Sequence, residues 1–136
     1  IGSQAIANGV AEEFALSKDI WPDHPCCVFI VRDEVIAKHG DAVHEITNSL
    51  VKSGQIIDQD IAAAAKVGAD FLGQKVEVMQ RVLSDPPDRL TTNRLFPVLD
   101  DLAFMQDYMV NAGILKGKAD LETFVDSSFA SEAGAK

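Results

Sequence analysis

The sequence predicts a helix-rich α/β fold, in which a short β segment at the front is followed by a layer of helices. A run of β-branched and aromatic residues from Cys26 to Val31 follows two prolines, which is typical of a buried strand. From Asp33 onward, apolar residues instead recur at three- and four-residue steps, the period of a helix. A chain of 136 residues, 47% of them hydrophobic, is long enough for one domain with a core.

The first quarter of the chain contains both predicted strands. Residues 4–10 predict a short helix, because Asn8-Gly9 suits a helix end. Residues 12–17 predict a strand or sheet edge, and residues 26–31 predict the main strand after the turn at Trp21-Pro22. Two strands cannot close a sheet of ordinary size. The missing partners must come from upstream sequence or from a second copy of the chain, unless the two segments are not strands.

The helical part begins with a short helix from Asp33 to Lys38, which Gly40 closes. Asp41 then caps a longer helix, whose apolar residues fall on one stripe. The members of this stripe are Val43, Ile46, Leu50, Gly54 and Ile57.

Two further helices have clear ends. A third helix begins near Asp58 or Asp60 and stops at Gly73. Its alanines and Gly68 leave little bulk on one face, so another helix can approach closely. A fourth helix ends at Asp85-Pro86-Pro87, because proline breaks the helical hydrogen-bond ladder.

The last third of the chain predicts a loop and two helical regions. Residues 88–95 are polar and predict the loop. Pro97 suits the first position of a helix that Gly113 closes. Asp120 can cap the final helical region.

The charge of the chain excludes several classes of partner. A net charge of −9 repels nucleic acid and anionic membranes, and no basic patch offsets it. The longest apolar run is far shorter than the roughly 20 residues that a membrane-spanning helix needs. The N-terminal residues lack the basic and apolar regions of a targeting signal. We therefore expect a soluble protein that does not bind nucleic acid.

The segment around the turn holds the side chains that are most able to bind a metal or a ligand. His24, Cys26 and Cys27 are all able to bind a soft or borderline metal. However, structural zinc sites need four ligands, and the chain has no second cysteine pair, so two small buried thiols are the favoured interpretation. Trp21 is either a core anchor, which we favour, or a stacking wall for a ligand. No catalytic motif is present, and we expect neither a metal nor a cofactor.

Several short segments together resemble the second half of the substrate-binding proteins of nitrate, sulfonate, taurine and bicarbonate importers. In the first part of the chain these segments are Gly2-Ser3-Gln4-Ala5, Asn8-Gly9-Val10, residues 17–28 and Asn48-Ser49-Leu50-Val51. Later ones are Leu95-Phe96-Pro97, Asp100, residues 105–109, Gly113-Ile114-Leu115, Asp120-Leu121 and Phe124-Val125-Asp126. The likeness spans nearly all of the chain.

This resemblance implies a truncated periplasmic-binding-protein type II fold, a clamp of two α/β lobes with the solute in the cleft between them. Residues 1–32 would form the end of lobe two with the hinge-crossing strands, and residues 33–136 the C-terminal helices of lobe one. It implies a non-enzymatic, solute-binding component of an ABC importer for a small anion or organic solute. Such a protein delivers its solute to a membrane permease and is periplasmic or at the cell surface in its full-length form.

The resemblance also implies which residues contact the solute. In the family, the segment after the Trp-Pro turn lies near the cleft, and many nitrate- and bicarbonate-type members have an acidic–basic pair after the second proline. Cys26 and Cys27 occupy those positions here, which removes a charge pair suited to a small oxyanion. The ligand-binding candidates are Trp21, His24, Cys26 and Cys27.

Two alternatives share the clamp fold. Thiamine-pyrimidine synthases carry an iron-associated cluster of cysteines at the equivalent strand, which would make the chain part of an enzyme. Binding-protein-like domains fused to importer ATPases sense a ligand without delivering it. We also expect this chain to self-associate, because strand edges and apolar surface left without partners tend to pair with another copy.

Overall fold

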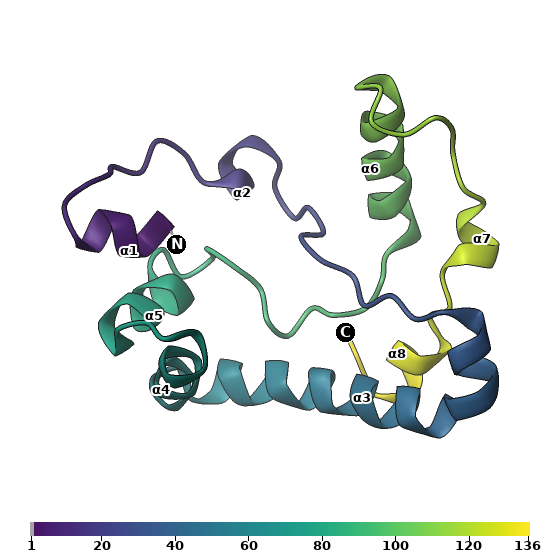
Figure 1. The fold of residues 1–136 in the computed structure, drawn as a ribbon, viewed down its shortest axis with the longest axis horizontal. Coiled ribbons are helices and arrows are strands. Elements are labelled where there is room, and N and C mark those ends of the chain that lie inside the picture. The colour runs from purple at the N-terminus through teal and green to yellow at the C-terminus, as the bar shows by residue number, and fades with distance from the viewer. Residues whose placement is uncertain (1) are drawn as a thin grey trace. The chain divides into compact units, whose positions relative to one another are not determined.

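The computed structural model describes residues 2–136, of which eight α-helices form the regular structure (Figure 1). Helices account for 59% of the chain, and no β-strand occurs within the described residues. The helices are α1 (Gly2–Ala7), α2 (Ser17–Ile20), α3 (Asp33–Gln59), α4 (Ile61–Leu72), α5 (Val76–Ser84), α6 (Leu99–Asn111), α7 (Leu121–Phe124) and α8 (Ser128–Glu132).

The prediction of an α/β fold with a hinge-crossing strand is wrong. Residues 12–16 and 26–31 have no regular secondary structure, and Ser17 begins α2. A strand is stable only when its backbone groups pair with a neighbouring strand. Nothing between residues 2 and 136 offers such a partner, and Val28, Phe29 and Ile30 are exposed. The β-branched run is therefore apolar but does not form a strand.

The chain divides into two compact units that interleave in the sequence. The first unit comprises Ile1–Asp23 and Lys52–Asn93, and the second comprises His24–Val51 and Arg94–Lys136. Residue 1, where the predicted front segment begins, lies outside the described residues. The assignment of residues 1–32 and 33–136 to two lobes of a larger clamp stays a prediction.

The first unit has its core between α4 and α5. Ala65 and Ala69 of α4 are fully or almost fully buried, as is Val78 of α5. A Cβ atom built on Gly68 would lie 3.0 Å from the Cε atom of Met79, so the two helices approach closely at this glycine. The predicted small-residue face of this helix is confirmed.

Local signals at both ends fix the length of α4. At its start, the side chain of Asp60 accepts a hydrogen bond of 2.9 Å from the backbone N–H of Ala63. At its end, Gly73 has a φ of 62°, the left-handed conformation that glycine adopts without strain. Both ends were predicted from these residue types.

The long helix α3 keeps the predicted break and part of the predicted stripe. Its backbone leaves helical geometry at His39, with φ −140° and ψ 37°, next to the expected stop at Gly40. The buried positions are Val43, Val51 and Gly54, whereas Ile46 and Leu50 are exposed. The buried face therefore includes Val43 and Gly54 of the predicted stripe, but it passes through Val51 and not through Ile46 and Leu50.

The second unit is held partly by the C-terminal segment. The His44 ring on α3 lies 4.4 Å from the Phe129 ring on α8, and His44 Nδ1 lies 3.3 Å from Glu132 Oε2. Farther along the chain, Gln106 on α6 exchanges two hydrogen bonds with the backbone of Ala119, of 2.6 and 3.1 Å.

In the described part of the chain, no helix is both long enough and apolar enough to span a membrane.

Candidate functional site

Helix α2 and the turn after it position Trp21 in the first unit. The Trp21 N–H donates to the carbonyl of Ser17 at 2.8 Å, which ends the helix. At the other end, the carboxylate of Asp19 accepts the N–H of Leu16 at 3.1 Å. This backbone hydrogen bond, together with one from Lys18, lowers the pKa of Asp19. Trp21 itself is half-buried.

The other three predicted residues lie in the second unit. His24 is half-buried, whereas Cys26 and Cys27 are exposed free thiols. The two Sγ atoms are 3.8 Å apart, so the structure does bring the cysteines together. The hydrogen bond and charge of Cys27 raise the pKa of the Cys26 thiol. Their predicted burial is wrong, and their role in ligand binding stays a prediction.

Metal binding at this segment would need more donors than the two thiols. Within residues 2–136, no group of three or more His, Cys, Asp and Glu side chains is arranged to hold a metal ion. Because a structural zinc or iron site takes about four protein ligands, the donors present do not fit such a group.

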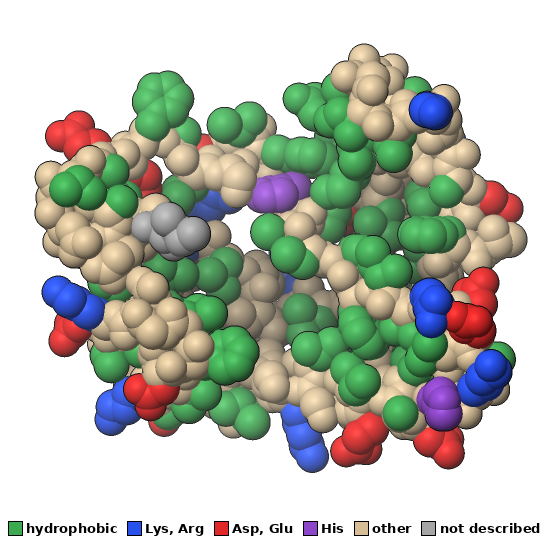
Figure 2. All heavy atoms as spheres, in the orientation of Figure 1, with side chains coloured by type: hydrophobic (Ala, Val, Ile, Leu, Met, Phe, Trp, Pro, Cys, Tyr) green, Lys and Arg blue, Asp and Glu red, His purple; other side chains and the backbone are tan. Residues whose placement is uncertain are grey.

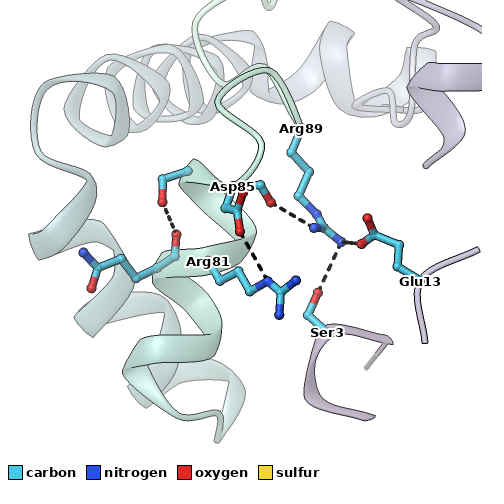
Figure 3. A network of polar contacts seen from close by, with 7 residues as sticks. Ser3, Glu13, Arg81, Asp85 and Arg89 are labelled. Carbon is cyan, nitrogen blue, oxygen red and sulfur yellow. Dashed lines mark hydrogen bonds and ion pairs between the residues drawn. The ribbon is translucent and has the colours of Figure 1, made fainter. Parts of the chain in front are cut away.

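A polar network surrounds Arg89 in the first unit (Figure 3). One guanidinium nitrogen lies 3.0 Å from Glu13 Oε2 and 3.4 Å from Ser3 Oγ, and the other donates to the carbonyl of Asp85 at 3.0 Å. The Arg89 side chain is only 14% exposed. Beside it, Arg81 Nε lies 3.5 Å from the Asp85 carboxylate. The network joins α1 and the segment before α2 to the loop after α5.

A second contact between the same segments involves Lys18. Its ammonium group lies 3.2 Å from the carboxylate of Asp88 and 3.3 Å from that of Asp19. The hydrogen bond with Asp88, and to a lesser extent the one with Asp19, raises the pKa of Lys18. Arg89 and Lys18 are thus each already paired with a carboxylate. Neither is poised to hold a small anion.

The first unit also has a shallow hollow of about 190 Å³. It is lined by Ile57, Asp58, Ile61, Leu83, Pro87, Asp88, Leu90, Thr91, Thr92 and Asn93. On its wall, the Asn93 amide donates to the Asp58 carboxylate at 2.9 Å. Its lining contains two carboxylates and no Lys, Arg or His side chain, which disfavours an anionic ligand.

Sequence reasoning missed both the Arg89 network and the hollow. Residues 88–95 form a loop as predicted, but a loop composition does not reveal partners far away in the sequence. Glu13 and Arg89 are separated by 76 positions and Ser3 and Arg89 by 86. The sequence feature that could have indicated this network is the charged pair Asp88-Arg89, which follows the two prolines.

Comparison with known proteins places the chain in a family. A family model described as the NMT1-like family matches residues 2–72, just over half of the chain. This range contains α1, α2, α3, α4 and the four predicted ligand-binding residues. No curated protein matches the chain, and no solved structure matches it. The chain therefore belongs to the NMT1-like family, a family of solute-binding proteins of the nitrate, sulfonate and taurine type.

Proposed function

We propose that this chain is a solute-binding component of an ABC importer, and that it binds a small anion or organic solute without chemical turnover. The family match across residues 2–72 carries this proposal. A binding protein of this kind delivers its solute to a membrane permease and works in the periplasm or at the cell surface.

The proposed solute contacts are Trp21, His24, Cys26 and Cys27. All four lie inside the matched range, and Cys26 and Cys27 are accessible. A thiol is mostly protonated at neutral pH, and the raised pKa of Cys26 reinforces this, so Cys26 gives the proposed contact wall a neutral, weakly polar atom. Such a wall suits the organic part of a sulfonate better than it suits nitrate or bicarbonate, which need charged or strong hydrogen-bond partners.

The test measures solute binding through Trp21, the only tryptophan of the chain. The protein as expressed from its gene is titrated with nitrate, bicarbonate, taurine and a short alkanesulfonate while tryptophan emission is recorded. We expect a saturable change with a sulfonate and a weaker change, or none, with nitrate. Calorimetric titration of the same samples checks that the optical change reports binding.

Variants then locate the contacts. His24→Gln and the double variant Cys26→Ser/Cys27→Ser should weaken sulfonate binding, by about tenfold if each loses about 1.4 kcal/mol of contact energy. The matched control is His39→Gln, because His39 is exposed and lies outside the candidate segment. No saturable binding of any of the four solutes by a folded protein would contradict the proposed function.

A further inference from the structure

Helix α4 has more apolar surface than its own unit covers. Of its twelve residues, only Lys66 and Asp70 are charged, and the others are alanine, glycine or larger apolar side chains. A helix that is apolar on all sides is normally buried on all sides. Here the face with Ala65 and Ala69 is buried, and α4 packs against α5.

A second face of α4 remains open. Ala63, Val67 and Phe71 recur at four-residue steps and therefore line one side of the helix. All three are exposed, Val67 at 70% and Phe71 at 88%. A single exposed apolar residue is ordinary, but a stripe along a whole helix is typical of an interaction surface.

We propose that a second copy of this chain covers this face, with the two α4 helices antiparallel about a twofold axis at Val67. In such an interface each residue after Val67 lies opposite the residue that precedes Val67 by the same number of positions. Phe71 then lies against the partner's Ala63, so that a large side chain fills the space above a small one, twice. Val67 meets its own copy at the centre.

The charged residues of α4 favour the same orientation. Lys66 and Asp70 lie on the same flank of the stripe, one turn apart. The twofold axis keeps this flank on one side of both helices, which brings Lys66 of each copy near the partner's Asp70. A parallel pair would instead place Phe71 against Phe71 and separate the opposite charges. The antiparallel pair is thus complementary in both shape and charge.

The surroundings explain why this face serves for self-association. The chain carries a net charge of −9, which repels a second copy over most of the surface. On α4 the charges of Lys66 and Asp70 cancel, so this helix adds no net charge to the repulsion. The helix is roughly 18 Å long at 1.5 Å per residue. The surface area that one such helix pair buries, even with the exposed Leu72 beside it, is smaller than the area of a tight interface. We expect dissociation constants on the order of 1–100 µM.

The experiment is sedimentation velocity of the whole chain at protein concentrations from about 1 to about 500 µM, a range that brackets the expected constant. The wild-type chain should shift from monomer to dimer. Val67→Glu places two carboxylates at the axis and should leave a monomer throughout. The control is Phe14→Ser, which removes a fully exposed apolar side chain from outside α4 and should keep the dimer.

Charge reversal tests the orientation separately. Lys66→Glu and Asp70→Lys should each weaken the dimer, and the double variant Lys66→Glu/Asp70→Lys should restore it because the opposite charges meet again. Since all these side chains are exposed, far-UV circular dichroism should show an unchanged helix content. A chain that is monomeric at every concentration overturns the proposal. A dimer that Val67→Glu and the single reversals leave intact overturns it as well.

Discussion

At the scale of single residues, Cys26 is the candidate contact whose chemistry the structure defines best. Its pKa is raised by Cys27, so at pH 8 a smaller fraction of Cys26 is thiolate than in an ordinary cysteine. Because the thiolate is the reactive form, the raised pKa should slow the alkylation of Cys26 by iodoacetamide. Replacing Cys27 by serine removes the cause and should speed the reaction at Cys26. Peptide mass spectrometry over time measures both rates, and equal rates before and after the replacement would contradict the pairing.

Arg89 is the residue on which the front of the first unit depends. Arg89→Met removes its hydrogen bonds to Ser3, Glu13 and Asp85, and should lower the free energy of unfolding by about 2 kcal/mol. The control is Arg32→Met, which removes an exposed ion pair with Glu34 and should cost less than about 0.5 kcal/mol.

Urea denaturation followed by circular dichroism provides the comparison between the two arginine variants. Equal losses would show that the Arg89 network is no stronger than a surface pair. Glu13→Gln should lower stability less than Arg89→Met does, because the other two hydrogen bonds of the guanidinium remain.

At the scale of elements, the contact between α4 and α5 depends on Gly68. Gly68→Ala should raise the free energy of unfolding by up to about 1 kcal/mol, because alanine favours the helix and the flexible end of Met79 can move away. Gly68→Val should lower it by about 1–3 kcal/mol, since a branched side chain forces the helices apart. Thermal unfolding of the two variants gives opposite signs if the packing is as described. Stabilisation by valine would contradict it.

The same elements show what the sequence could and could not predict. The ends of α4 depend on Asp60 and Gly73, which act on backbone within a few residues of themselves, so local reasoning finds them. The prediction of a strand at residues 26–31 was wrong because a strand needs a neighbouring strand to pair with. An apolar run does not show whether such a neighbour exists. Residue types also drew attention to Trp21 and His24, whereas the Arg89 network required contacts across the chain.

At the scale of the whole molecule, few side chains are deeply buried and many apolar ones lie at the surface (Figure 2). Among the described residues, the buried hydrophobic positions are Val43, Val51, Ala65, Ala69, Val78 and Ala130. All of these are valine or alanine, so the hydrophobic stabilisation is modest. Unfavourable terms of a few kcal/mol therefore matter for this chain.

One such unfavourable term is the repulsion that arises from the net charge of the chain. With 21 acidic and 12 basic residues, the folded chain brings like charges together, and salt screens this repulsion. Ion pairs such as Arg32–Glu34 and Arg81–Asp85 are exposed and gain little from low salt. Raising NaCl from about 0.01 to about 0.15 M, which shortens the screening length from roughly 30 to 8 Å, should therefore raise the Tm. Scans on the Val67→Glu monomer separate this effect from dimerisation, and a Tm that falls with salt would show that attractive pairs outweigh the net charge.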